Sequence, residues 1–397
     1  MVSVVERWNI HPDIPWLWGV RPDPEVQFDE RFNAWNVYGY QDVVTVLGDS
    51  KTFSNRTVDL AAVQIDPAYL EGDMTQMDPP ENLKYRRLVS NVFTPKVVAG
   101  LEARVTAITD ELLDVIEAKD EDAVDLVADL AYPLPVIVIA DLLGIPNSDR
   151  DLFIHHSTKI IEQMNGLTFL AEDAQEGVEQ AVEEFLPLLE YMRAQVADRR
   201  AHPRDDVVSR LLAAEVDGAP LTENAVVNIV NFLLGAGHIP TTLMIGNAVV
   251  CLDADPAQFE RVRQDRSLVP GALDEVLRTL PPSATLSRRT TTEVELSGVR
   301  IPADQMVLPW LGAANRDPRR FENPDVFDVT RSPNPHLGFG QGAHFCIGSH
   351  LAKMQGRVAL NRLMDRFPKL SVDPDVPPDF FPTQDLLGVR SLRVRRD

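Results

Sequence analysis

Apolar residues recur at three- and four-residue spacing through most of the chain between about residues 80 and 280. Segments 101–118 (LEARVTAITDELLDVIEA) and 178–201 (VEQAVEEFLPLLEYMRAQVADRRA) show this spacing most clearly, and it places apolar side chains on one face of a helix. We expect further helices from about Tyr40 to Leu47 and from about Ser349. The middle of the chain is therefore predicted to be mainly helical.

Strand-like alternation occurs nearer the two ends. Segments 32–40 (FNAWNVYGY) and 290–302 (TTTEVELSGVRIP) alternate apolar and polar residues and predict strands. No internal repeat or low-complexity linker divides the chain. We therefore predict a single domain over 1–397, mainly α-helical. Its smaller β-rich part comes from about 1–60, from 283–310 and from short C-terminal strands.

The most apolar stretch, Ile229–Leu252, predicts a long helix with Thr222 as its N-cap. It contains His238 and other polar residues, so a buried core helix explains it better than a membrane span. It also contains Pro240, which cannot donate a hydrogen bond to the carbonyl of Ala236. The sequence predicts that the helix breaks or bends there.

Composition narrows the class of protein. Of the 397 residues 44% are hydrophobic, and 60 acidic against 38 basic side chains give a formal charge of −22. This balance disfavours binding to nucleic acid or to anionic membranes. The two cysteines, Cys251 and Cys346, allow at most one disulfide, and residues 1–20 do not resemble a signal peptide. We expect a soluble, cytoplasmic protein.

The chemical signal is concentrated in residues 339–352, FGQGAHFCIGSHLA. Gly340, Gly342 and Gly348 surround Cys346 in a loop that leads into a helix, and glycine lets the backbone approach a flat partner closely. A lone cysteine is most often a small buried hydrophobe, but this glycine frame and the following helix N-terminus favour a thiolate. One thiolate without a second cysteine nearby fits zinc or iron–sulfur clusters badly and fits an axial haem ligand well.

This stretch resembles the haem-binding loop of the cytochromes P450, FGxGxHxCxG followed by LA. A second stretch, Glu275-Val-Leu-Arg278 followed by two prolines, resembles the family's ExxR helix; residues three apart on a helix face the same way and can pair. Residues 77–95 and 313–318 (AANRDP) also resemble soluble bacterial members. The resemblance covers nearly the whole chain. It implies the cytochrome P450 fold, with haem between the long central helix and the helix that follows the cysteine loop.

The resemblance assigns roles around a haem b cofactor. Cys346 would be the axial thiolate ligand of the iron. His344, Arg86 and Arg288 would hold the haem propionates as charge-assisted donors, and Phe339 would pack beside the sulfur and exclude water. Gly340 and Gly348 complete this set.

The sequence departs from the family pattern at two of these positions. Asn82 stands where the family often has a histidine; it can donate a hydrogen bond but carries no charge, and we include it in the cofactor set. Val326 stands where an arginine often follows Pro-Asp, so the resemblance does not by itself imply a three-part Glu–Arg–Arg network here. Arg289 directly follows Arg288, and we assign the propionate contact to Arg288.

The long central helix departs more strongly from the family pattern. Many relatives carry AGHETT there, an acid followed by a threonine over the distal face of the haem. Ala236 and Gly237 match the start of that pattern, but Ile239 replaces the acid and Pro240 replaces the threonine, while Thr241 matches the second threonine. These five positions are our candidate catalytic residues. Neither Ile239 nor Pro240 can relay a proton, so proton delivery should be atypical.

Three substitutes for the relay remain open: a substrate hydroxyl that holds an ordered water, Thr241, or direct use of peroxide. We expect a monooxygenase that inserts one atom of O2, by hydroxylation or epoxidation, into a bulky hydrophobic secondary metabolite such as a polyketide or macrolide. Electrons would come from a separate ferredoxin and ferredoxin reductase. A peroxide-driven haem-thiolate enzyme and a non-catalytic haem-binding protein are the alternatives. The substrate pocket is expected to involve 56–76, 160–180, 232–241, the segment just after Pro282, and Leu386.

Overall fold

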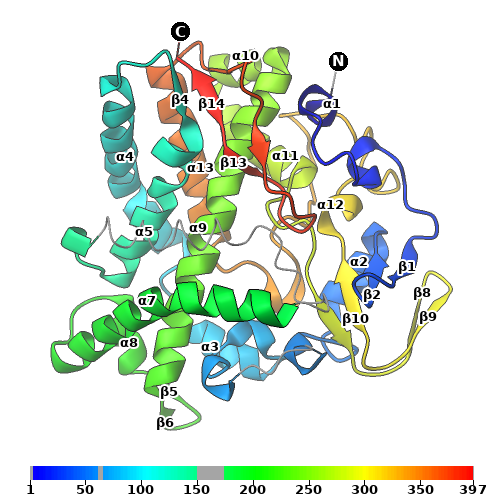
Figure 1. Ribbon diagram of the computed structural model, residues 1–397, viewed down its shortest axis with the longest axis vertical. Helices are drawn as coiled ribbons and strands as arrows, with labels where there is room; N and C mark the ends of the chain where they lie inside the picture. The colour runs from blue at the N-terminus through cyan, green and yellow to red at the C-terminus, as the bar shows by residue number, and fades with distance from the viewer. Residues whose placement is uncertain (1–2, 61–65, 150–173, 397) are drawn as a thin grey trace.

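The architecture is built around one long helix, α9 (Glu223–Ala254), which runs through the middle of the molecule (Figure 1). The computed structural model describes residues 3–60, 66–149 and 174–396. Most side chains of α9 are buried, because other helices pack around it. These neighbours include α5 (Pro133–Leu143), α7 (Ala174–Ala201), α11 (Val269–Thr279) and α13 (Ser349–Arg366).

Helix α9 begins as predicted and does not break at its proline. The Thr222 hydroxyl accepts a hydrogen bond from the backbone N–H of Ala225 at 3.1 Å and caps the helix. The helix then continues through Pro240 without interruption, so the predicted break does not occur. Proline removes only the hydrogen bond to the carbonyl of Ala236, and the buried turns on both sides keep theirs.

The apolar stretch of α9 is a core element. In the described part of the chain, α9 is the one helix that is long and apolar enough to cross a membrane by length and composition. Within its apolar window, 72% of the residues are buried inside the molecule. Its hydrophobicity is therefore explained by packing against neighbouring helices.

Strands from both ends of the chain form the main sheet, whose order is β1-β2-β10-β7-β3. The central pair, β2 and β10, is parallel, and the other pairs are antiparallel. The five strands are β1 (Val26–Asp29), β2 (Ala34–Val37), β10 (Met306–Pro309), β7 (Arg288–Thr290) and β3 (Phe53–Ser54).

The remaining strands form smaller sheets. The segment predicted to alternate folds into the hairpin β8 (Val294–Leu296) and β9 (Val299–Ile301). A three-stranded sheet joins β11 (Ser371–Val372), β14 (Arg393–Arg395) and β4 (Ala123–Asp125); β4 lies within the region expected to be helical. Two further pairs are β12 (Asp379–Phe380) with β13 (Val389–Ser391) and β5 (Glu215–Val216) with β6 (Ala219–Pro220).

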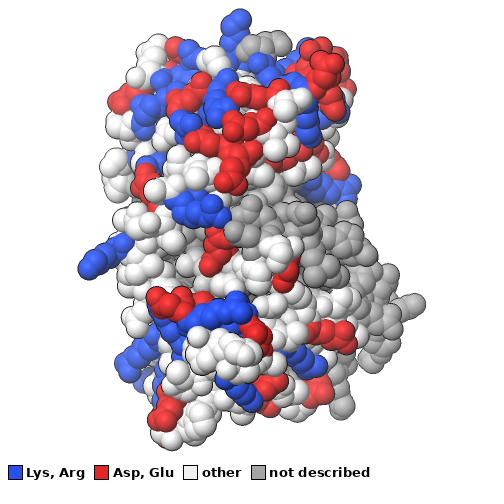
Figure 2. Space-filling model, turned by 90° about the vertical axis from the view of Figure 1, so that its left-hand side faces the viewer, with Lys and Arg blue, Asp and Glu red and all other residues white. Residues whose placement is uncertain are grey.

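Helix α4 (Pro95–Ala118) covers the predicted helix 101–118 and packs along α13. Thr94 caps its N-terminus. Ion pairs cross the contact between the two helices: Arg366 of α13 lies 2.8 Å from Asp114 and 2.7 Å from Glu117 of α4. The upper part of the face in Figure 2 accordingly carries interspersed acidic and basic side chains. The other α-helices among the described residues are α1 (Val4–Trp8), α2 (Tyr40–Gly48), α3 (Glu81–Ser90), α8 (Val207–Leu212), α10 (Pro256–Gln264) and α12 (Leu311–Ala314).

The histidine of α9 has a strongly perturbed environment. His238 has no exposed surface, and its ring packs edge-on against Tyr132 at 5.8 Å between centroids. Its Nδ1 donates to the carbonyl of Leu234 at 2.8 Å. Burial lowers the pKa of His238 from 6.5 to about 4, an effect that the bond to Leu234 partly opposes.

This burial predicts a specific pH dependence of stability. Between pH 6.5 and about 4 the unfolded chain binds a proton at His238 that the folded chain does not bind. The free energy of unfolding should therefore decrease as the pH is lowered through that window. The decrease in the free energy of unfolding should approach about 3 kcal/mol at the acidic end of the window. Denaturant unfolding at several pH values should show a shallower pH slope for His238→Leu. The matched control is His350→Leu, at an exposed position; an unchanged slope in His238→Leu would contradict the assignment.

Candidate functional site

The cysteine loop is closed by a backbone hydrogen bond. The N–H of Cys346 donates to the carbonyl of Phe339 at 2.9 Å, so the two ends of the loop meet. Gly340 and Gly342 turn the chain between them with φ of +69° and +74°, in the left-handed region that glycine favours. The C-terminal end of α2 packs against this turn: a Cβ on Gly342 would lie 2.7 Å from the carbonyl oxygen of Leu47.

Cys346 lies just before α13, at the position where the loop becomes helix. Burial raises the pKa of its thiol, while a hydrogen bond from the N–H of Gly348 and the nearby guanidinium of Arg86 act in the opposite direction. The pKa of the thiol is raised overall, and the Gly348 N–H and the Arg86 charge reduce the cost of forming a thiolate at this sulfur. Phe339 packs beside the loop, with its ring 6.3 Å from that of Phe345.

A cluster of nitrogen donors lies beside the loop and comes from three separate parts of the chain. Asn82 and Arg86 are one turn apart on α3, so they face the same way. Arg86 donates to the carbonyl of Phe345 at 2.8 Å, and Asn82 Nδ2 lies 3.1 Å from His344 Nε2. Arg288, at the start of β7, is only 4% exposed.

These groups disfavour one another's charge. Burial, and after it the charges of Arg288 and Arg86, lower the pKa of His344 to about 4. Burial also lowers the pKa of Arg288 to about 10, which Asp78 partly opposes. Removing cationic groups from water without enough acid nearby is unfavourable unless an anion completes the site. The cluster therefore fits a cofactor that brings carboxylates, such as the propionates of haem.

The register of the two adjacent arginines is resolved by their surroundings. Arg289 turns outward and pairs with Asp304 at 2.6 Å and with Asp59 at 2.7 Å. Arg288 points inward, and its Nη1 donates to the carbonyl of Ser287 at 2.7 Å. The inward arginine is the one assigned to the cofactor from the sequence.

One face of α9 is accessible in the middle of an otherwise buried helix. Ala236 is exposed, and Gly235 and Pro240 are half-buried. Because Ala236 and Pro240 are four residues apart, they share this face. An accessible strip of small residues on a core helix is what a flat group packed against the helix requires.

Thr241 lies on a different face of α9. It is 4% exposed, and its hydroxyl donates to the carbonyl of Gly237 at 3.2 Å. Gly237, four residues earlier on the same face, packs against α5: an added Cβ would lie 3.0 Å from Ile139 Cδ1. Thr241 is rotated by about 100° from Pro240. The structure therefore separates Thr241 from the accessible face on which a relay would be needed.

Ile239 belongs to an apolar wall. It packs with Leu243 of α9, with Phe381 and with Leu386. Leu386 forms a β-bridge with Ser283, so segments predicted to line the pocket after Pro282 and near Leu386 meet the central helix. The segment expected at 160–180 lies largely outside the described residues, as does part of 56–76.

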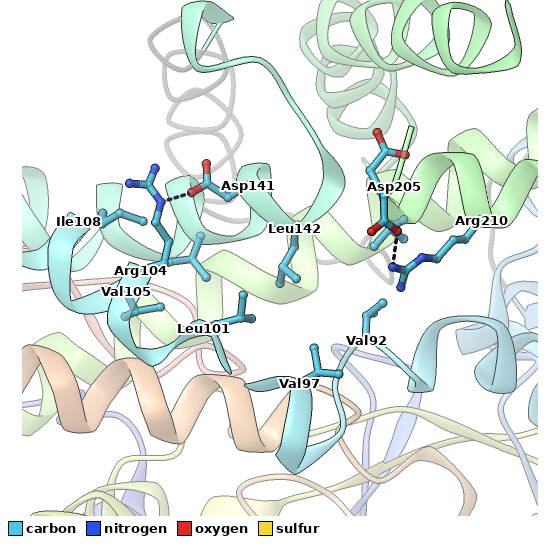
Figure 3. Close-up of a pocket in the computed structure, with 13 residues that line it drawn as sticks. Val92, Val97, Leu101, Arg104, Val105, Ile108, Asp141, Leu142, Asp205 and Arg210 are labelled. Atoms are coloured by element: carbon cyan, nitrogen blue, oxygen red, sulfur yellow. Dashed lines mark hydrogen bonds and ion pairs between the residues drawn. The ribbon is translucent and has the colours of Figure 1, made fainter. Parts of the chain in front are cut away.

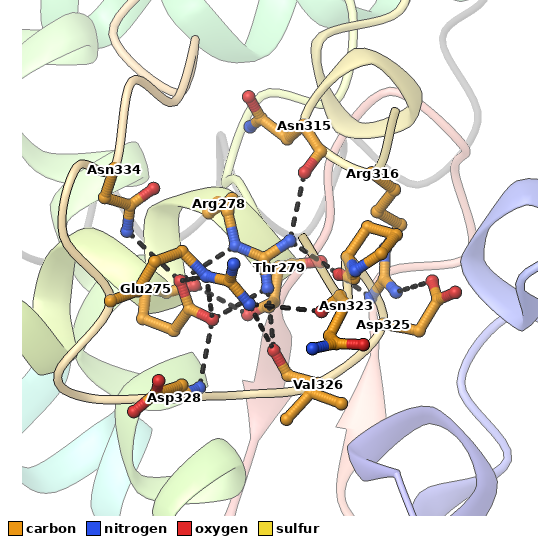
Figure 4. A network of polar contacts seen from close by, with 12 residues as sticks. Glu275, Arg278, Thr279, Asn315, Arg316, Asn323, Asp325, Val326, Asp328 and Asn334 are labelled. Carbon is orange, nitrogen blue, oxygen red and sulfur yellow. Dashed lines mark hydrogen bonds and ion pairs between the residues drawn. The ribbon is translucent and has the colours of Figure 1, made fainter. Parts of the chain in front are cut away.

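The ExxR pair is buried and has a third member (Figure 4). Glu275 and Arg278 have no exposed side-chain surface and lie 2.7 Å apart. Arg331 completes the network, with its Nε 3.1 Å from Glu275 Oε1. The three-part network that Val326 brought into question is therefore present. The second arginine comes from five residues further along the chain, and Val326 instead offers its backbone carbonyl to both arginines.

The sequence interpretation did not identify Arg331 or two further partners of Glu275. The N–H of Asp328 donates to Glu275 Oε1 at 3.0 Å, and Asn334 Nδ2 donates to Oε2 at 3.1 Å. Asn334 lies five residues before Phe339, so it connects the carboxylate to the segment entering the cysteine loop. The sequence signal for this third partner was Arg331 itself. It was missed because it lies further from the Pro-Asp pair than the family pattern places its arginine.

A separate hollow of about 220 Å³ lies between α4, α5 and α8 (Figure 3). Val105, Ile108 and Val138 contribute apolar surface to it. Ion pairs of Arg104 with Asp141 (2.8 Å) and of Arg210 with Asp205 (2.7 Å) stand among its lining residues. None of the site residues predicted from the sequence lines this hollow.

Known proteins resemble this chain over nearly all of its length. Residues 31–394 match the family described as Cytochrome P450. The chain is 39% identical to cyclomarin C epoxidase CymV of Salinispora arenicola over 380 residues, which cover 96% of this chain and 94% of that protein. It is also 39% identical over 384 residues to the erythromycin C-12 hydroxylase of Saccharopolyspora erythraea, again covering 96% and 94%.

Solved structures agree with these sequence relationships. HmtT, involved in himastatin biosynthesis, superposes with a TM-score of 0.90 at 54% identity and full coverage of both chains. HmtN, a post-tailoring hydroxylase involved in himastatin biosynthesis, superposes with a TM-score of 0.90 at 50% identity, also over both full chains.

The third member of the ExxR network can be tested by substitution. Arg331→Met should lower the free energy of unfolding by about 3 kcal/mol, because it removes one cation from a fully buried carboxylate. Urea denaturation of the haem-loaded protein measures this, with Arg300→Met at an exposed position as the control. If both variants unfold at the same urea concentration, Arg331 is not part of the stabilising network.

Proposed function

We propose that this chain, which belongs to the cytochrome P450 family, hydroxylates or epoxidises a bulky and mostly hydrophobic secondary metabolite, such as a polyketide or macrolide. The protein is a monooxygenase, and members of its family bind haem b through a cysteine thiolate. The observation that carries the residue assignments is the convergence of Cys346 with buried and half-buried cationic and amide groups from three segments of the chain.

Cys346 is the proposed axial ligand. The alternative, Cys251, is buried on α9 with its thiol pKa raised to about 12 by burial, an effect that Thr279 partly opposes. Cys346 instead lies in a glycine-shaped loop directly before α13; burial raises the pKa of its thiol too, and Gly348 and Arg86 act against that shift. Haem bound there supplies O2 activation, which electron donation from a thiolate ligand favours.

Arg86, Arg288 and His344 are proposed to hold the two propionates, with Asn82 as an uncharged helper. Arg288 contributes most, because its guanidinium is nearly buried and a charge-assisted hydrogen bond strengthens where water is excluded. Asn82 also keeps His344 in place through its 3.1 Å contact. In this arrangement Asn82 positions the neighbouring histidine instead of adding a positive charge.

The proposed substrate class rests on two observations. The relatives reported above include a cyclomarin C epoxidase and an erythromycin C-12 hydroxylase, whose names refer to large secondary metabolites. In this chain Ile239, Leu243, Phe381 and Leu386 form an apolar cluster that includes the residue next to Pro240, and apolar surroundings suit a large hydrophobic ligand. Small-molecule substrates and O2 are common to the family.

The two protons that the reaction consumes, as one oxygen atom enters the product and the other leaves as water, are proposed to come through a water held by a hydroxyl of the substrate. Ile239 and Pro240 offer no proton at the positions of the usual acid and alcohol. Thr241 is the less favourable substitute, since its hydroxyl already donates to Gly237 and it faces α5. The accessible strip at Ala236 and Pro240 leaves room for a water there.

The electron donors are proposed to be a separate ferredoxin and its reductase, in the cytoplasm. A peroxide-driven reaction is the second candidate, because Pro240 disrupts the usual relay. Ile239 argues against it, since an apolar side chain cannot grip a substrate carboxylate. Product formation with hydrogen peroxide alone, at the rate of the ferredoxin-supported reaction, would favour that candidate. Substrate-induced spectral shifts without oxidation of any tested compound would favour a non-catalytic haem-binding protein.

The ligand assignment can be tested spectroscopically. Cys346→Ser should abolish the Soret band that marks the thiolate-ligated, reduced carbonyl complex, because no other thiolate lies in the loop. Cys251→Ser is the matched control and should retain the band. Retention of the band in Cys346→Ser would contradict the proposed ligand.

The source of the protons can be tested by removing each candidate hydroxyl in turn and by restoring the usual acid and alcohol. Thr241→Ala should leave the ratio of product to consumed electrons unchanged, because its hydroxyl does not face the accessible strip. A deoxy analogue of the substrate should bind but divert electrons to peroxide. The double variant Ile239→Glu, Pro240→Thr restores an acid and an alcohol and should recover coupling with the deoxy analogue. Uncoupling in Thr241→Ala, with equal turnover of substrate and deoxy analogue, would overturn the proposal.

A further inference from the structure

The AANRDP turn, residues 313–318, contacts both the ExxR helix and the approach to the cysteine loop. Asn315 directly follows α12 and has no exposed surface. Its side-chain Nδ2 donates to the carbonyl of Leu277 at 3.3 Å, and its Oδ1 accepts the N–H of Leu337 at 2.7 Å. One amide therefore bridges the end of α11 and the segment that enters the loop.

The two prolines after α11 explain why this bridge is needed. In a regular helix the carbonyl of Leu277 would accept the N–H of residue 281, but Pro281 has none. Asn315 supplies the missing donor. The next residue of the turn acts similarly: Arg316 Nη2 donates to the carbonyl of Thr279, the last residue of α11, at 3.2 Å.

The bridge lies where helix and loop approach most closely. A Cβ on Gly338 would come 2.7 Å from the carbonyl oxygen of Leu277, so the two backbones are almost in contact there. Arg278 Nη1 also donates to the backbone carbonyl of Asn315 at 3.0 Å (Figure 4), which fixes the turn to the ExxR network. Arg278 thus holds the backbone of Asn315 in place, while the Asn315 side chain makes the bridge.

The position of Asn315 is transmitted to the sulfur through very few bonds. Leu337, which Asn315 holds, is two residues before Phe339, and the carbonyl of Phe339 accepts the N–H of Cys346. The turn also reaches the other side of the loop: Asp317 accepts the N–H of Tyr40 at 3.0 Å at the start of α2, and the far end of α2 packs against Gly342.

We propose that Asn315 is a positioning residue for the axial cysteine: its amide sets the separation between the ExxR helix and the cysteine loop, and so holds Cys346 in the geometry that keeps a thiolate on the iron. The role requires a donor and an acceptor on one short side chain, which an amide provides and a carboxylate or alanine does not. The inference rests on the proposed function of Cys346.

The test compares Asn315→Asp and Asn315→Ala with the unaltered haem-loaded protein. The measured quantity is the ratio of thiolate-ligated to thiol-ligated reduced carbonyl complex, read from their two Soret bands. We expect this ratio to fall about tenfold in each variant, the size of change that one unpaired buried backbone group produces. The nearly isosteric Asn315→Asp keeps the test available if Asn315→Ala does not fold.

The matched control is Asn247→Ala. Asn247 is equally buried and also bridges two backbone carbonyls, those of Leu280 at 3.0 Å and Leu387 at 2.8 Å, but it does not contact the loop segment. It should lose comparable stability in urea while keeping the unaltered band ratio.

The outcomes separate this inference from the function on which it rests. An unchanged band ratio in both Asn315 variants, or an equal fall in Asn247→Ala, overturns the positioning role and leaves the haem-thiolate assignment intact. Absence of the thiolate band from the unaltered protein overturns the assignment of Cys346, and the positioning role with it.

Discussion

The ion pair between Glu275 and Arg278 is the interaction on which the site depends, because it places a carboxylate and a guanidinium where neither has any contact with solvent. Such a pair is tolerated only when the remaining donors and acceptors are also satisfied. The structure meets this demand with Arg331, Asn334 and the backbone of residues 315–328. Nearly all of these partners lie in the segment that leads to the cysteine loop, so satisfying the ion pair also fixes the path of that segment.

The second constraint is electrostatic and concerns the opposite side of the loop. Arg86, Arg288 and His344 approach one another with little acid among them, and the lowered pKa values of Arg288 and His344 express the cost. The folded state can bear this unfavourable free energy because α3, β7 and the loop are each held by other contacts. Stability is thereby exchanged for a preorganised anion site, as is common at functional sites.

The central helix α9 lacks the acid and the alcohol that many relatives carry at the positions of Ile239 and Pro240. Pro240 and Ile239 remove the usual proton-relaying groups, and the helix nevertheless remains continuous and buried. In the proposed mechanism, its open strip at Ala236 and the apolar cluster at Ile239 would leave proton delivery to a substrate hydroxyl and to water. In this respect the protein would couple its chemistry to the identity of its ligand more tightly than a relative with a complete acid–alcohol pair.

The sequence by itself determined much of the local structure. The spacing of apolar residues predicted α4 and α7, the most apolar stretch predicted α9 and Thr222 marked its start, and the glycine frame around Cys346 identified the loop. These features depend on residues close together in the chain, where helix periodicity and backbone freedom act directly. The resemblance to the cytochromes P450 supplied the fold, which the comparisons confirm.

Only the tertiary structure decided which distant side chains meet. It identified Arg331 as the partner of Glu275, turned Thr241 toward α5, and joined Leu277 to Leu337 through Asn315. Each of these contacts links segments whose separation is set by packing and loop length, and no local pattern encodes that separation. The same reason explains the continuity of α9: the chain around Pro240 favours a break locally, whereas burial of the turns on either side holds the helix together.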